Sequence, residues 1–246
     1  MIARAQVGLL PGRSRGGRRH GRASGARGMS PRAARTTPRN RSRSQPESLD
    51  KATLVRAAAE VADRVGWSEL TLSEVAREVD RHVTSLYAHV DGLDDLRREV
   101  TLLALDEMSD AVWRATLGRV REDALRGIAL ALRQYCEDHP ARAAAVILTK
   151  HGLDPEQVNK AKRLAEPVQA TLRSFGLTEN QVFHAHRAFA ASVWGFTQGE
   201  NGELFPEGRV DESFEQILEM FFLALNSGTW PSERRKRPAT RAAKRR

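Results

Sequence analysis

Residues 71–90 hold a group of polar side chains whose types and spacing suit the recognition of DNA bases. The stretch reads Thr-Leu-Ser-Glu-Val-Ala-Arg-Glu-Val-Asp-Arg-His-Val-Thr-Ser-Leu-Tyr-Ala-His-Val. It predicts two short helices separated by a turn of three or four residues, which is a helix-turn-helix. Polar side chains at the start of the second helix can reach base edges in the major groove. Two ordinary amphipathic helices of a bundle give the same pattern, so both interpretations stay open. The polar residues at that start are Arg81, His82, Thr84 and Ser85.

The other residues with chemical potential form no catalytic or metal-binding pattern. His184 and His186 are two positions apart on an expected helix, so their side chains point about 200° apart. Cys136 is followed by Glu137 and Asp138, whose negative charges raise a thiol pKa and disfavour a nucleophile. The sequence contains neither a Gly-rich phosphate loop nor a Gly-x-Ser-x-Gly turn. We therefore expect no enzyme activity, no cofactor and no bound metal.

The composition is that of a folded protein without a membrane-spanning segment. Of the 246 residues, 40% are hydrophobic, which is enough to form a core. No apolar run approaches the roughly 18 residues that a membrane-spanning helix needs. The single cysteine excludes an intrachain disulfide and fits a reducing compartment. We expect a cytoplasmic protein that does not contact a membrane.

The net charge of +9 is unevenly distributed along the chain. Residues 1–48 contain twelve arginines and one acidic residue, and residues 231–246 contain eight Lys or Arg and one acidic residue. Residues 49–230 contain 20 basic and 29 acidic residues, so this middle part carries a charge of −9. Both ends are rich in Gly, Ser, Pro and Arg, and we expect disordered basic arms that flank an acidic folded part.

Three interpretations of the N-terminal arm remain open. It can be a solvated tail, or upstream sequence that precedes a true start at Met29. It can instead bind DNA and add phosphate contacts. It also has the Arg- and Ser-rich, acid-poor composition of an organelle transit peptide, although it lacks amphipathic spacing.

Helices are the elements that must position these residues. Three helix starts carry capping signals: Thr71 with Glu74, Thr178 with Gln181, and Asp154 followed by a proline. No stretch alternates convincingly between apolar and polar residues, so we expect an all-α protein. The expected helices are 50–65, one from 71 to about 80, a short one that carries Leu86, then 93–116, 119–138, 140–150, 155–175, 178–198 and 211–226, with a loop at 199–210.

The sequence resembles the TetR family of transcriptional regulators. The run Ser-Leu-Tyr-Ala-His-Val followed by Asp-Gly-Leu-Asp-Asp-Leu-Arg-Arg carries much of the likeness. Further matches are Leu70-Thr71, Val75-Ala76 and Leu96. The C-terminal part resembles the Trp-His-Gly type of ligand-binding domain in this family, through Trp194-Gly195-Phe196, Glu200 and 211–225, with Trp194 where a histidine is expected. The resemblance covers about 49–226.

The resemblance implies a homodimeric, ligand-responsive DNA-binding regulator, a repressor that a small molecule releases from its double-stranded DNA operator. It implies a three-helix DNA-binding domain at 49–97 and a larger helical ligand-binding and dimerisation domain at 98–230. The alternative is a helical dimer that binds a ligand or protein and has lost specific operator recognition. By position in the family motif, Val83 and Thr84 would face bases beside Arg81 and His82, and Ser73, Ser85, Tyr87 and His89 would hold phosphates.

Two departures from the family pattern concern DNA binding. Asp80 stands in the turn where the family prefers glycine, and we expect a left-handed backbone there, which Asp tolerates better than most residues. Leu93 replaces a usual lysine and removes one phosphate contact. Residues 49–98 contain seven Lys or Arg and ten acidic residues, and this net charge of −3 is unfavourable next to DNA.

Two further residue sets are candidates for the ligand pocket and the dimer interface. A pocket needs apolar walls with a few placed polar groups. A wide apolar seam on 211–226, next to 178–198, suits a four-helix bundle with the symmetry mates. Plain core packing is the alternative for every member of both sets. The pocket candidates are Trp113, His151, Phe183, Arg187 and Trp194, and the interface candidates are Phe189, Val193, Phe214, Leu218, Phe221, Phe222 and Leu225.

Overall fold

The computed structural model describes residues 49–148, 154–202, 204–205 and 208–228. These residues belong to one compact unit that begins at Glu47. All the regular secondary structure in them is helical, so the all-α prediction is confirmed. None of the helices in these ranges is both long and apolar enough to cross a membrane.

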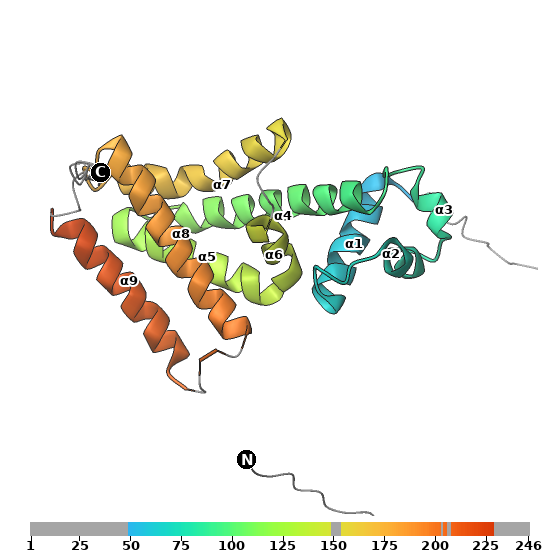
Figure 1. The fold of residues 1–246 in the computed structure, drawn as a ribbon. Coiled ribbons are helices and arrows are strands. Elements are labelled where there is room, and N and C mark those ends of the chain that lie inside the picture. Colours follow the sequence, from blue (N-terminus) through green and yellow to red (C-terminus); the bar gives the residue numbers. More distant parts are fainter. Residues whose placement is uncertain (1–48, 149–153, 203, 206–207, 229–246) are drawn as a thin grey trace, which may run out of the picture. The chain divides into compact units, whose positions relative to one another are not determined.

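The first three helices form the predicted helix-turn-helix unit (Figure 1): α1 (Lys51–Val65), α2 (Leu72–Glu78) and α3 (Val83–Leu86). Asp50 caps α1 by accepting a 2.7 Å hydrogen bond from the backbone N–H of Thr53. Thr71 caps α2 in the same way, with a 3.2 Å bond from the N–H of Glu74, as its sequence signal predicted. The three helices pack around a common apolar cluster that includes Leu54, Val75, Leu86 and Leu96.

The long helix α4 (Leu93–Thr116) joins two separate hydrophobic clusters (Figure 1). Its first turns bury Leu96 and Val100 against the helix-turn-helix. Its later turns bury Met108 and Val112 in the larger C-terminal cluster. The domain boundary that the sequence analysis places at 97/98 therefore lies inside one continuous helix, which fixes the spacing between the two clusters.

The remaining helices are α5 (Arg121–Asp138), α6 (Pro140–Leu148), α7 (Pro155–Arg173), α8 (Glu179–Asn201) and α9 (Val210–Asn226). The starts of α7 and α8 carry complete capping boxes, at Asp154 and Thr178, where the sequence predicted them. Helix α8 extends three residues into the predicted loop. Gly199 lets the ring of Phe205 lie directly against α8, because a Cβ at that position would be 2.7 Å from the ring. Phe205 also stacks on Phe196, and this contact helps to hold the last turn of α8 in place.

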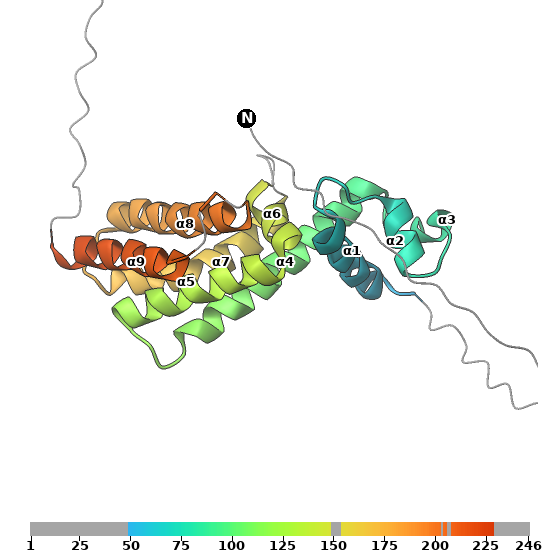
Figure 2. The ribbon, with the colours of Figure 1, turned by 90° about the horizontal axis from the view of Figure 1, so that it is seen from below.

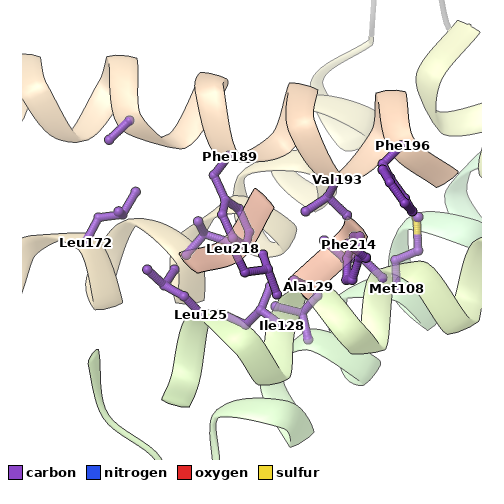
Figure 3. Packing of buried hydrophobic residues seen from close by; sticks show 14 of the residues in the cluster. Met108, Leu125, Ile128, Ala129, Leu172, Phe189, Val193, Phe196, Phe214 and Leu218 are labelled. Atoms are coloured by element: carbon purple, nitrogen blue, oxygen red, sulfur yellow. The ribbon is translucent and has the colours of Figure 1, made fainter. Parts of the chain in front are cut away.

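The C-terminal core is built where α8 and α9 lie side by side over α5 (Figure 2). Phe189 and Val193 of α8 point toward Phe214 and Leu218 of α9 and toward Ile128 of α5 (Figure 3). Phe214 is completely buried, and its ring centroid lies 5.2 Å from that of Phe196. These contacts assign the inner faces of α8 and α9 to the core of a single chain.

Candidate nucleic-acid interface and ligand cavity

The turn between α2 and α3 depends on a left-handed residue, as the sequence analysis expected. Asp80 has φ 51° and lies directly after the C-cap of α2. The backbone N–H of Arg81 donates to the carbonyl of Ala76 (2.9 Å), and that of Asp80 donates to the carbonyl of Arg77 (3.3 Å). This pair of bonds is the Schellman arrangement, which needs a left-handed residue in the position that Asp80 occupies. The turn therefore ends α2 sharply and directs the chain into α3.

Helix α3 presents polar side chains outward while Leu86 anchors it to the apolar cluster. Tyr87, which follows α3, has 56% of its surface exposed. This fraction is large for a tyrosine, a residue type that is usually at least partly buried. Val83 differs from the other candidates, because its side chain packs partly against the cluster and is less available to a base than Thr84. Of the predicted DNA-contacting residues, Ser73, His82, Thr84, Ser85 and Tyr87 are exposed, and Arg81, Val83 and His89 are half-buried.

The positive charge of this unit is partly neutralised within the chain. Arg64 forms a 2.6 Å ion pair with Glu78, and Arg77 forms a 2.6 Å ion pair with Glu74. Arg97 is directed inward, where its guanidinium donates to the carbonyl of Ser68 at 3.1 Å. These arrangements add to the acidic balance of residues 49–98, so the unit offers little cationic surface to phosphates.

A second candidate site is an apolar cavity of about 280 Å³ lined by residues of α4, α5, α6, α7 and α8. Of the pocket candidates, Trp194 lines it, whereas Trp113, Phe183 and Arg187 do not. Trp113 is 41% exposed, and Phe183 is exposed with the guanidinium of Arg187 4.1 Å from its ring centroid. His151 lies outside the described residues. The lining consists of Val112, Leu132, Val146, Ile147, Ala161, Leu164, Ala165, Val168, His186, Phe189, Ala190 and Trp194.

Small residues on facing helices explain the cavity. Ala161 and Ala165 are four positions apart on α7, so they share one face of that helix, and Ala190 of α8 also lines the cavity. Alanines at three lining positions leave space that larger side chains would fill. The pocket candidates chosen from the sequence were aromatic or charged residues, so these alanines were not among them. The predicted divergence of the two histidines is confirmed, since His184 is exposed and His186 lines the cavity.

Cys136 is unsuited to nucleophilic chemistry, as expected, although for a different reason. Burial raises the pKa of its thiol to about 11, and the charge of Glu200 contributes in the same direction. A hydrogen bond with Thr197 acts in the opposite direction. The cause is therefore the loss of water around the sulfur rather than the neighbouring Glu137 and Asp138. At neutral pH this thiol stays protonated.

The predicted interface residues need a correction. Phe189, Val193, Phe214, Leu218, Phe222 and Leu225 have at most 4% of their surface exposed in a single chain, so they belong to its own core. Phe221 is half-buried, with its ring centroid 5.5 Å from that of Phe189. Sequence periodicity showed that α9 is widely apolar but not which face turns inward. The exposed large apolar side chains of α8 and α9 are Phe183 (46%), Met220 (60%) and Leu223 (69%).

Helix α6 connects the two candidate sites. At its start, Asp63 of α1 accepts hydrogen bonds from the backbone N–H groups of Ala141 (3.0 Å) and Arg142 (3.1 Å). The side chain of Arg142 returns an ion pair to Asp63, with 2.9 Å between Nε and Oδ2. Near its end, Val146 and Ile147 form part of the cavity wall. One helix of nine residues therefore contacts both the cavity and the helix-turn-helix unit.

Comparisons with known proteins agree with this architecture. Residues 125–221 match the family described as "Tetracyclin repressor-like, C-terminal domain". The chain is 36% identical to an uncharacterized HTH-type transcriptional regulator of Mycobacterium tuberculosis, Rv0681, over 78% of this chain and 87% of that protein. It is 25% identical to an uncharacterized HTH-type transcriptional regulator of Bacillus subtilis, YobS, over 73% of this chain and 90% of that protein.

Solved structures share the fold at low sequence identity. A protein with unknown function from Rhodococcus sp. RHA1 superposes with a TM-score of 0.65 at 16% identity, covering 74% of this chain and 99% of its own. The Streptomyces coelicolor TetR family protein ActR, solved in complex with (S)-DNPA, gives a TM-score of 0.56 at 19% identity with the same coverage of both chains.

The left-handed backbone at Asp80 predicts an order of stability among its variants. Asp80→Gly and Asp80→Asn should unfold at urea concentrations close to that of the parent, because both residues tolerate this conformation. Asp80→Val should lose about 1–2 kcal/mol relative to Asp80→Gly, since a β-branched side chain is strained there. Equal free energies of unfolding for the valine and glycine variants would contradict the role assigned to this turn.

Proposed function

The chain belongs to the TetR family of transcriptional regulators, and from this premise we propose that it is a homodimeric cytoplasmic repressor released from its operator by a small molecule. Helix-turn-helix residues would bind double-stranded DNA, and the cavity between α4 and α8 would bind the effector. The observation that carries the proposal is the position of α6, which contacts both sites. That ActR was solved with a bound small molecule supports an effector of this kind.

The contacts of α6 support release by a mechanical route. An effector that pushes on Val146 or Ile147 displaces a short helix, because an α-helix moves as a unit over nine residues. The displacement strains the hydrogen bonds that the start of α6 donates to Asp63. Because Asp63 lies near the end of α1, the strain acts on α1 as well. A shift of α1 moves α2 and α3, which share its apolar cluster. An effector that favours the displaced state thereby disfavours the DNA-bound one.

A second candidate function rests on the charge of the DNA-binding unit. Residues 49–98 carry a net charge of −3, and one of their carboxylates, that of Asp80, belongs to the turn directly before α3. This balance favours a helical dimer that binds a ligand or protein and no longer recognises an operator. The basic residues of 1–48 can compensate on DNA, and their contribution stays a prediction because they lie outside the described residues.

Operator binding distinguishes the two functions and tests the residue roles. In gel shifts against its own upstream DNA, the protein should bind that duplex in preference to a scrambled one. Tyr87→Phe should weaken binding to both duplexes, because a phosphate contact carries no sequence information. Thr84→Ala should change the preference at one base pair by about 1–3 kcal/mol. His184→Ala, far along the chain on α8, is the control. Equal binding of both duplexes by the parent protein would favour the second function.

Coupling through Asp63 can be tested without knowing the effector. Ala190→Trp fills the cavity and stands in for a ligand, so it should weaken operator binding several-fold. Asp63→Asn keeps an acceptor for the N–H groups of α6 but removes the ion pair with Arg142. In the double variant the effect of Ala190→Trp should shrink toward zero, which operator titrations of all four proteins measure. Glu60→Gln, an exposed change on α1, is the matched control. Purely additive effects would refute the route through α6.

The exposed apolar face of α8 and α9 is the proposed dimer interface. Leu223 is 69% exposed in the single chain, so Leu223→Glu should leave the fold intact. Pairing with a symmetry mate would bury that carboxylate without a partner, and the dimer should dissociate. Sedimentation equilibrium measures the outcome, with Leu130→Glu, at 42% exposure on α5, as the control that stays dimeric. A folded Leu223→Glu protein that remains a dimer would place the interface elsewhere.

A further inference from the structure

The lining of the cavity carries information about the effector itself, and this inference rests on the proposed effector site. We propose that the cavity selects an uncharged, mainly apolar molecule that presents one hydrogen-bonding group to His186. The cavity of about 280 Å³ is just below the usual size range for drug-sized ligands. The effector is accordingly a compact molecule, and the chemistry of the lining residues narrows the class of compounds that can bind.

Ten of the twelve lining residues are Ala, Val, Leu, Ile or Phe, and the other two are His186 and Trp194. No Asp, Glu, Lys or Arg lines the cavity within the described residues. A charged group placed against such a wall loses its water without gaining a counter-charge, and this cost disfavours carboxylates and ammonium groups. The wall therefore excludes charged ligands more strongly than it selects among apolar ones.

Several charged residues on the helices around the cavity have partners outside it. Arg133 of α5 pairs with Glu200, with 2.9 Å between Nε and Oε2. Lys160 of α7 pairs with Asp106 of α4 at 2.5 Å. On α8, the guanidinium of Arg187 lies over the exposed ring of Phe183.

Arg163 of α7 is also held in an ion pair, with Asp110 of α4 at 2.7 Å. A ligand carboxylate would have to break one of these ion pairs to obtain Arg133, Lys160 or Arg163 as its partner. Such an exchange gives up one favourable pair for another, so it offers no net gain for an anionic ligand.

His186 is a polar lining residue that can both donate and accept a hydrogen bond. Neither of its ring nitrogens has a hydrogen-bond partner among the described residues. Burial lowers the pKa of the ring, and the charge of Arg187 lowers it further, so the imidazole is neutral at neutral pH. A neutral imidazole offers one donor and one acceptor, and a hydroxyl, carbonyl or amide of the ligand can use either.

The second amphipathic residue, Trp194, is eight positions after His186 on the same helix. At 1.5 Å per residue the two positions are about 12 Å apart along α8. Phe189 and Ala190 line the cavity between them. A ligand with its polar group at His186 therefore places its apolar body along Phe189 and Ala190 toward the indole of Trp194.

A matched series of naphthalene derivatives tests the charge selection on the full-length protein. Isothermal titration at neutral pH should detect binding of 2-naphthol. Naphthalene-2-carboxylate and 2-naphthylmethylammonium, which differ in charge but little in shape, should bind at least about tenfold more weakly. Ala190→Trp should abolish binding of 2-naphthol, which locates the site. Equal affinity for the carboxylate or ammonium compound overturns the proposal, as does a series in which no member binds.

The role of His186 is tested by the difference between 2-naphthol and naphthalene. In the parent, 2-naphthol should bind about threefold to tenfold more tightly, as expected for one hydrogen bond. His186→Leu should remove that difference without weakening naphthalene. His184→Leu, a change of the neighbouring exposed histidine, should leave both affinities unchanged. Retention of the preference in His186→Leu would show that another group meets the hydroxyl and would overturn the assignment.

Failure of this inference is distinguishable from failure of the proposed function. Operator release is measured separately, by gel shift with saturating 2-naphthol. Selective binding of 2-naphthol without release supports the ligand class and removes the regulatory role of the cavity. Release by the carboxylate compound instead supports the regulatory role and overturns the ligand class.

Discussion

The contact between Asp63 and the start of α6 is the interaction on which the relation between the two halves of this chain depends. The side chains of Asp63 and Arg142 are only 14% and 11% exposed, so each charge needs the other. Asp63 also accepts two backbone N–H groups at the positive end of the α6 dipole. Loss of either side chain would remove one counter-charge from a nearly buried ion. The carboxylate therefore works as a cap for α6 that another helix supplies.

The cap at the start of α6 is connected to α4 and α5 through further polar contacts. Arg142 also lies 3.3 Å from Glu107 of α4, and Glu107 accepts a 2.7 Å hydrogen bond from the hydroxyl of Tyr135 of α5. Four helices thus meet at one polar network, and α4 continues from there into both hydrophobic clusters. A displacement of α6 cannot be absorbed locally, since close-packed interiors transmit strain. In the proposed mechanism, the network and the long helix together couple the DNA-binding unit to the contents of the cavity.

The sequence predicted what local chemistry determines and missed what tertiary packing determines. Caps at Thr71, Asp154 and Thr178 and the left-handed backbone at Asp80 follow from residues within a few positions of each other. The buried face of α9 does not, because apolar residues surround most of that helix and only its neighbours decide which turn inward. The cavity was missed for the same reason, since alanines reveal a void only when the facing helices are known.

The acidic character of the DNA-binding unit determines which contacts can provide its specificity. Affinity for any duplex comes largely from phosphate neutralisation, with a salt slope of about −0.9 per neutralised phosphate. Arg64 and Arg77 are already paired with carboxylates, so few cations of α1 and α2 remain for phosphates. In the proposed complex, hydrogen bonds from neutral groups such as Thr84 and Tyr87 would then carry a larger share of the binding free energy. Such a unit would discriminate between sequences through its base contacts and would depend on charge from the rest of the chain, or from a partner subunit, for affinity.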